Sequence, residues 1–102
     1  MLKRQHKVVL SNELWIVINE RAALEERSAS GLCNYVMQYY IDLAPADRPA
    51  ILLRQVKPEA ALRSLYIDKV SWAKLRALKV EQRRPISAII EQQMRLYLGL
   101  DV

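Results

Sequence analysis

The sequence contains little of what stabilises small secreted domains or anchors proteins in membranes. Its 102 residues include one cysteine, two glycines and no phenylalanine. The single cysteine, Cys33, excludes an internal disulfide framework and is typical of proteins in a reducing compartment. The apolar run after the basic start MLKRQHK is three residues long, too short for a signal-peptide core. No segment approaches the roughly 20 apolar residues of a transmembrane helix. These absences predict a cytoplasmic protein without a membrane partner.

What is present favours one small helical domain. Hydrophobic residues make up 52% of the chain, and Leu, Ile, Ala, Glu, Gln and Arg dominate, which suits helices around a core.

The net charge of +5 is unevenly distributed along the chain. Residues 1–44 carry five basic and five acidic side chains, whereas residues 45–102 carry eleven basic and six acidic ones. A basic surplus suits a polyanionic partner such as nucleic acid, or it only keeps the protein soluble.

Two segments of the chain repeat each other. RSASGLCNYVMQYYI (27–41) aligns with RPISAIIEQQMRLYL (84–98) at an offset of 57 residues. The same offset places Ser11 on Asp68, both good helix N-caps. The identical pairs are Trp15 with Trp72, Arg27 with Arg84, Ser30 with Ser87, Met37 with Met94 and Tyr40 with Tyr97. The chain therefore consists of two copies of one unit.

Each unit is predicted to contain a strand and two helices. The first has a strand over 6–10, a helix over about 12–26 and a second helix from Ser28 or Ser30 to about 42. The second has a strand over about 63–67, a helix over about 69–82 and a helix from Pro85 to Gly99. We expect one compact domain, 1–102, with units 5–42 and 62–98. The connector, 43–61, is predicted to contain a short helix that opens near Asp47–Pro49 and stops before Pro58.

Apolar residues at helical spacing predict the faces that form the core. The expected inward residues of the helices are Leu14, Trp15, Ile18, Ala22, Leu32, Cys33, Val36, Met37, Tyr40, Val70, Trp72, Leu75, Leu78, Ile86, Ile89, Ile90, Met94 and Tyr97. No phosphate-binding loop, nucleophile with its base or set of metal ligands occurs, and His6 has no partner at ligand spacing. We therefore expect no enzyme, no cofactor and no metal site.

A short strand ending in Leu-Ser-x-Glu-Leu, an amphipathic helix, an ERS break and a helix running through Leu-Cys-x-Tyr-Val-Met resemble the ribbon-helix-helix superfamily. That superfamily includes the Arc, MetJ and CopG-type repressors. The similarity covers residues 5–41 and, more weakly, 62–98; tandem members resemble the DNA-binding accessory proteins of plasmid transfer systems. The resemblance implies a mainly α fold with a short two-stranded antiparallel β-ribbon, formed here by one chain as an intramolecular pseudo-dimer. A unit alone would leave a bare strand edge and an open apolar helix face.

The resemblance also implies how the chain would contact DNA. The family's ribbon enters the major groove, where base pairs can be distinguished. Because side chains alternate along a strand, Val8, Leu10, Leu65 and Ile67 are expected to face inward. The expected base-contacting residues are Gln5, Lys7, Val9, Ser64 and Tyr66. Lys7 could bind guanine and Val9 a thymine methyl group, although Lys7 and Tyr66 could equally be ordinary exposed strand residues and Val9 could pack on a neighbour.

Helix N-termini would add contacts to phosphates, since their free N–H groups and the helix dipole favour anions. Pro85 has no N–H, so we expect the clamp in the second unit to be weaker or to depend more on Arg83 and Arg84. Ser28 and Ser30 could instead be helix caps only. The expected phosphate-contacting residues are Lys3, Arg4, Arg27, Ser28, Ser30, Arg63, Arg83, Arg84 and Ser87.

The sequence thus predicts a nucleoid-associated, sequence-specific double-stranded DNA-binding protein. It would act as a transcriptional repressor or a plasmid-maintenance or transfer regulator at an asymmetric site, and chains could associate further on adjacent sites. The alternative is a protein-interaction module, antitoxin-like or a relaxosome scaffold, with secondary DNA binding. Its protein partner would dock on the connector at exposed Ile51–Leu53. A third alternative is that one unit has lost DNA binding and is purely structural. The first unit, with a net charge of zero, would then be the one affected.

Overall fold

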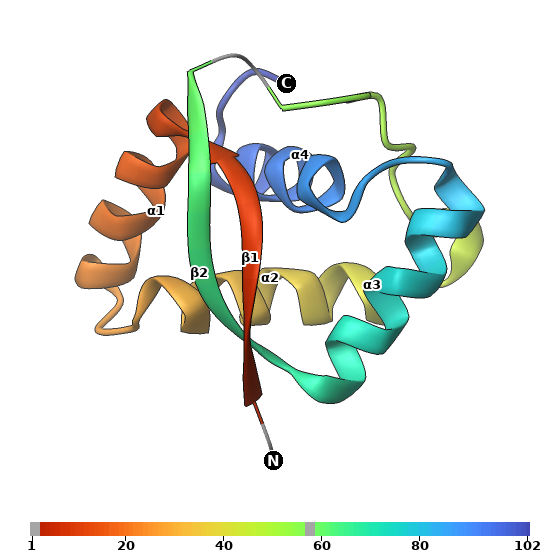
Figure 1. Ribbon diagram of the computed structural model, residues 1–102, viewed down its shortest axis with the longest axis horizontal. Coiled ribbons are helices and arrows are strands. Elements are labelled where there is room, and N and C mark those ends of the chain that lie inside the picture. The colour runs from red at the N-terminus through yellow and green to blue at the C-terminus, as the bar shows by residue number, and fades with distance from the viewer. Residues whose placement is uncertain (1–2, 57–58) are drawn as a thin grey trace.

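The computed structural model describes residues 3–56 and 59–102 and contains, within them, four α-helices and a two-stranded antiparallel sheet. The prediction of a mainly helical protein with such a sheet is confirmed. The two strands lie side by side in front of α2 and α4, with α1 beside β2 and α3 beside β1 (Figure 1). None of the described helices is long and apolar enough to cross a membrane. The elements are β1 (Lys3–Ser11), α1 (Asn12–Leu24), α2 (Ala29–Asp42), a 3-10 helix, η1 (Pro45–Asp47), β2 (Ala60–Asp68), α3 (Lys69–Gln82) and α4 (Ile86–Leu98).

The two strands pair in a register centred on the repeat. Lys7 lies opposite Ser64, and these two positions are equivalent at the 57-residue offset. Every other strand pair has an equivalent pair at the same offset: Gln5 opposite Tyr66, for example, is equivalent to Val9 opposite Leu62. Both strands have nine residues, longer than the predicted 6–10 and 63–67. Apolar residues mark only the packed middle of each strand, but a backbone ladder extends through polar residues whenever a partner lies alongside.

Each first helix begins directly at a strand end because the last strand residue is also the N-cap. The side chain of Ser11 accepts a hydrogen bond from the Leu14 N–H (3.2 Å), and that of Asp68 accepts one from Ser71 (3.3 Å). This sharing leaves no loop between strand and helix, so the direction of each strand is coupled to that of the helix that follows it. The two N-caps are the pair that the repeat predicted.

The second helices begin differently from each other. Ser28 caps α2 by accepting from the Gly31 N–H (2.9 Å). Pro85 is the N-cap of α4 and supplies no side-chain cap, and α4 begins at Ile86. The placement of Pro85 inside the helix was therefore wrong by one position. Its missing N–H removes nothing from the first turn of α4.

The core lies between the inward face of the sheet and the four helices. Val8, Leu10, Leu65 and Ile67 are all buried, as the alternation predicted. Two expected core residues are exposed: Val70 is 54% exposed and Tyr97 39%. Three more, Trp15, Trp72 and Ile86, are only partly buried and pack against the core. Val70 lies in the first turn of α3 and Tyr97 in the last turn of α4, where a helix extends past the elements it packs on.

The connector is held to α4 by one side chain. The Gln92 Oε1 accepts hydrogen bonds from the Leu52 and Leu53 N–H groups (2.6 and 3.0 Å), and its Nε2 donates to the Ala50 carbonyl (2.7 Å). These bonds replace those of a helix, and residues 48–56 are not helical. Among the described residues the connector contains the short helix η1, but η1 ends where the predicted helix was expected to open, near Asp47–Pro49, so the predicted position was wrong. Pro58, its expected limit, lies outside the described residues.

Ile51 is buried, at 4% exposure, whereas Leu52 is 71% exposed. The expectation of an exposed Ile51–Leu53 segment was therefore wrong for Ile51. Within this stretch, Leu52 is the apolar side chain most available to a docking partner.

Candidate nucleic-acid interface

The outward face of the sheet contains every residue predicted to contact bases. Residues opposite each other in an antiparallel pair point to the same face. The register pairs Gln5 with Tyr66 and Lys7 with Ser64, and it pairs Val9 with Leu62. Gln5, Lys7 and Tyr66 are exposed, and Val9 and Ser64 are partly exposed.

Leu62 belongs to the same face and was missed by the sequence analysis. It is 66% exposed, and it lies one residue before the predicted start of the second strand. The repeat offset would have found it, because Gln5 maps onto position 62. A large apolar side chain held exposed beside Val9 is a natural contact for thymine methyl groups.

At the centre of this face, the two strands are linked by a side-chain hydrogen bond. The Lys7 Nζ donates a hydrogen bond to the Ser64 Oγ across the two strands. Because the bond is exposed to solvent, it can be exchanged for a bond to a base edge at little net cost.

Residues on the opposite side of the strands pack on the two tryptophans. The His6 ring stacks on Trp72, with centroids 3.7 Å apart and an angle of 13° between the planes. The equivalent strand position in the other unit is Arg63, whose guanidinium lies 5.4 Å from the Trp15 ring centroid. Each strand thus packs on the first helix of the other unit.

Arg63 was predicted to contact phosphate, but it lies in mid-strand on the helix-facing side. It also donates to the Asn12 Oδ1. Two neighbours therefore hold its guanidinium.

The His6 ring is neutral at pH 7, because burial, and then the charge of Arg4, lower its pKa.

The N-termini of α2 and α4 dock on the outer edges of the ribbon through the two repeat serines. Ser30 Oγ accepts from the Tyr66 N–H (2.8 Å), and Ser87 Oγ accepts from the Val9 N–H (2.9 Å). These two bonds are equivalent under the repeat. Accepting leaves each hydroxyl proton free to donate, so a structural role and a phosphate contact are compatible.

The predicted phosphate-binding arginines differ in what already engages them. Arg27 forms an ion pair with Glu25 (3.3 Å) and lies over the Tyr35 ring at 4.4 Å. Arg84 donates to the Ile51 carbonyl (3.1 Å) and to the carbonyl of Arg83 (3.0 Å). Both are therefore partly committed within the chain.

Three other predicted cations, Lys3, Arg4 and Arg83, have exposed side chains. Arg83 adopts a left-handed backbone conformation (φ 54°) as the C-cap of α3. Arg83 thus lies in the turn between α3 and α4, three residues before the first residue of α4. The predicted cations are not one cluster but lie at the strand start and at both helix breaks.

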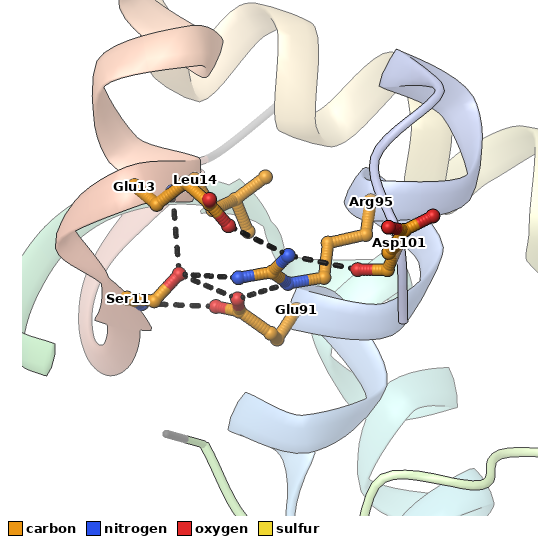
Figure 2. Close-up of polar contacts among 6 residues, drawn as sticks. All are labelled: Ser11, Glu13, Leu14, Glu91, Arg95 and Asp101. Atoms are coloured by element: carbon orange, nitrogen blue, oxygen red, sulfur yellow. Dashed lines mark hydrogen bonds and ion pairs between the residues drawn. The ribbon is translucent and has the colours of Figure 1, made fainter. Parts of the chain in front are cut away.

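A buried polar cluster joins β1, α1 and α4 (Figure 2). Glu91 accepts from the Ser11 N–H (2.9 Å), from the Ser11 hydroxyl (2.6 Å) and from Arg95 Nε (2.7 Å). Arg95 Nη1 also contacts the Glu13 carboxylate (2.9 Å) and the Asp101 carbonyl (2.8 Å). Burial alone would lower the pKa of Arg95, but its hydrogen bonds to Glu91 and Glu13 outweigh burial and raise it. Arg95 therefore stays charged and holds the end of β1 to α4.

The other unit has an equivalent cluster in which neutral amides replace the buried ion pair. Asn34 and Gln38 stand at the positions of Glu91 and Arg95, and Asp68 at that of Ser11. The Asp68 N–H donates to Asn34 Oδ1 (3.1 Å), and the Ser71 hydroxyl donates to Gln38 Oε1 (2.9 Å). The sequence analysis overlooked both clusters, although the offset of 57 relates them position by position.

Cys33 is buried, and burial raises the pKa of its thiol to about 12. A thiol with that pKa is protonated at neutral pH and is a poor nucleophile. Among the residues that the structure describes, no group of three or more His, Cys, Asp or Glu side chains could hold a metal ion.

Comparison with known proteins finds no matching family model, no similar curated protein and no similar solved structure.

Proposed function

We propose that this chain is a tandem ribbon-helix-helix protein, folded as an intramolecular pseudo-dimer, that binds double-stranded DNA at an asymmetric site. The observation that carries the proposal is the two-stranded sheet. Its inward residues Val8, Leu10, Leu65 and Ile67 are buried under helices, and its outward residues from Gln5 to Val9 and from Leu62 to Tyr66 are at least partly exposed and able to contact bases. The register centred on Lys7 and Ser64, with the paired contacts of Ser30 and Ser87, supports the pseudo-dimer.

The outward face has the chemistry for direct contacts in the major groove, which admits a two-stranded ribbon. Lys7 can donate to guanine O6 and N7, and Gln5 can bond to adenine in a bidentate manner. Val9 and Leu62 can meet thymine methyl groups, and Tyr66 can use its hydroxyl or its ring.

The N-termini of α2 and α4 would clamp the phosphates on the two sides of the groove. The serine bonds hold each N-terminus at a ribbon edge, and helix N-termini attract anions through free N–H groups and the helix dipole. In α4 no side chain caps these N–H groups, because Pro85 cannot do so. We therefore expect the α4 clamp to be at least as strong as the α2 clamp, contrary to the weaker clamp predicted from Pro85.

The two halves of the site should differ in sequence because the two strands do. Positions equivalent under the repeat carry different chemistry: Gln5 corresponds to Leu62, Lys7 to Ser64 and Val9 to Tyr66. A homodimer would present identical strands and select a palindrome. We propose that one chain binds one asymmetric core site as a repressor or plasmid regulator.

The test is selection of bound sequences from random duplex DNA at about 150 mM salt, with the full chain. We expect an asymmetric motif to emerge, and its affinity should fall with salt at a log–log slope of about −0.9 per phosphate contacted. A strictly palindromic core site bound by one chain would overturn the asymmetry. If no motif emerges, the sequence-specific function is wrong.

Lys7→Ala should relax one position of the selected motif and weaken the intact site by about 1–3 kcal/mol. Lys74→Ala removes the same charge from α3, away from the ribbon, and serves as the control. Equal losses of affinity for the two variants would show that Lys7 acts only through its charge.

A protein-interaction module is the second candidate. The observation in its favour is an apolar hollow between the ends of α2 and α4, away from the ribbon. It is lined by Val36, Tyr39, Tyr40, Leu43, Pro49, Gln93, Leu96 and Tyr97. Co-purification of a stoichiometric partner, abolished by Tyr39→Asp but retained in Lys7→Ala, would favour this function over DNA binding.

A further inference from the structure

The surface of α3 beside β1 forms a basic groove. Two adjoining hollows share Trp72, Ala73 and Arg76. One hollow is also lined by Arg4, His6 and Lys69, and the other by Ala77, Lys79, Val80 and Ile86. The groove thus leads from β1, along α3, to the start of α4.

Four cations line this groove: Arg4, Lys69, Arg76 and Lys79. All four are exposed, and none forms an ion pair with a described residue. They differ in this from Arg27 and Arg95, whose charges are compensated within the chain. An uncompensated row of cations attracts a polyanion.

The same path on the other unit carries one cation, Arg63 at the position of His6, and its guanidinium is held by Trp15 and Asn12. Arg4, Lys69, Arg76 and Lys79 correspond to Ala61, Asn12, Asn19 and Ala22, and Ala77 corresponds to Glu20. General solubility would not require cations on one side only, because the two first helices are equally accessible in the fold. Lys69, Arg76 and Lys79 belong to the second unit, so part of the charge difference between the units lies on this groove.

The dimensions of the groove match a nucleic-acid backbone. From Lys69 to Lys79 the helix rises roughly 15 Å, at about 1.5 Å per residue. That length corresponds to roughly four nucleotides at about 3.4 Å of duplex axis per nucleotide. Both ends of the groove meet proposed DNA-contacting elements, the ribbon edge and the α4 N-terminus, so one strand could pass along all three.

We propose that this groove binds the sugar-phosphate backbone of duplex DNA flanking the core site, on the α3 side alone. This inference rests on the proposed DNA-binding function and extends it. The footprint of one chain is then longer on the α3 side than on the α1 side. The second unit supplies most of the non-specific affinity, and the ribbon supplies the sequence preference.

The test uses the full chain and the duplex obtained by selection, extended by about ten base pairs, roughly one helical turn, on each side. Lys69→Gln with Arg76→Gln should make the log–log salt slope less negative by about 1.8. At about 150 mM salt the affinity should fall by roughly thirty-fold, about five-fold for each phosphate that is no longer neutralised. Hydroxyl-radical protection should shorten on one side of the core site, and the selected motif should stay the same.

The matched control compares two single variants, Lys74→Gln and Arg76→Gln. Lys74 lies on the same helix but lines a different hollow, with Ile41, Arg48 and Glu81. Its substitution should leave slope and footprint unchanged. Asn19→Arg, at the position equivalent to Arg76, should lengthen the footprint on the α1 side.

If the chain selects a motif but the double variant binds it with the parental slope and footprint, the groove is not a DNA-binding surface and only this inference fails. The same holds if Arg76→Gln and Lys74→Gln have equal effects. A chain that neither selects a motif nor binds duplex DNA in a salt-dependent way overturns the proposed function and this inference together. Circular dichroism melting of each variant confirms that the exposed substitutions leave the fold intact.

Discussion

Arg95 is a charged side chain almost completely enclosed by the protein, with 2% exposure. Its enclosure is tolerable because Glu91 and Glu13 supply negative charge and Ser11 and the Asp101 carbonyl accept the remaining N–H groups. The equivalent Gln38 needs no such surroundings because it is neutral. The two units solve the same packing problem with different chemistry, and only the charged solution is vulnerable to removal of one partner.

Arg95→Met should therefore lower the free energy of unfolding by about 3–5 kcal/mol, because it leaves the Glu91 carboxylate buried without a cation. Urea unfolding followed by circular dichroism measures the decrease. Adding Glu91→Gln to Arg95→Met should recover part of it, because the buried carboxylate is then replaced by a neutral amide.

The other unit provides the control: Gln38→Met should cost about 1 kcal/mol or less, since Gln38 is exposed and uncharged. Equal decreases in stability for Arg95→Met and Gln38→Met, or no recovery in the double variant, would contradict this account of the cluster.

At the scale of the elements, the ribbon is held by its outer edges as well as by its core. A two-stranded sheet leaves half of its backbone N–H and C=O groups pointing outward, where they need other partners. Here the N-terminal turns of α2 and α4 supply them through Ser30 and Ser87. This docking places each helix N-terminus beside the ribbon, where the proposed DNA backbone would pass.

Ser87→Ala should cost about 1–2 kcal/mol of stability, because the partly buried Val9 N–H loses its acceptor. Ser30→Ala should cost less than about 1 kcal/mol, since the Tyr66 N–H is exposed and water can replace the hydroxyl. Urea unfolding of the two variants, run in parallel, measures the difference. A larger decrease for Ser30→Ala than for Ser87→Ala would contradict the conclusion that burial makes the Ser87 hydrogen bond the stronger of the two.

At the scale of the whole molecule, one chain supplies both strands. The radius of gyration is 12.6 Å, close to the value of about 13 Å expected for a domain of about 100 residues. The sheet therefore needs no second chain, in contrast to a dimer whose partner strand comes from another molecule.

The thermal unfolding midpoint should consequently be independent of protein concentration, shifting by less than about 1 °C over a roughly hundred-fold range. Scanning calorimetry at low and high concentration measures this. A midpoint that rises with concentration would show that strands are exchanged between chains, and it would contradict the proposed intramolecular pseudo-dimer.

Much of the architecture could be predicted because it follows from local patterns. Helical periodicity located all four helices, and alternation identified Val8, Leu10, Leu65 and Ile67 as inward residues. Where these patterns stop, prediction failed: the connector helix, the exposed Val70 and Tyr97, and the strand ends each depend on a neighbour far away in sequence. Gln92, for example, takes the backbone bonds of Leu52 and Leu53 across a separation of 40 and 39 residues along the chain.

The sequence by itself determined the helices, the repeat and the side of each strand that faces the core, because period and offset are properties of the chain alone. Only the tertiary structure decided which cations are available. The sequence made Arg4, Arg27, Arg63 and Arg84 equal candidates and did not single out Lys69 or Arg76. Packing engages Arg27, Arg63 and Arg84 with Tyr35, Trp15 and the Ile51 carbonyl. The physical reason is that a side chain's availability depends on what surrounds it in space, and residues distant in sequence supply those surroundings.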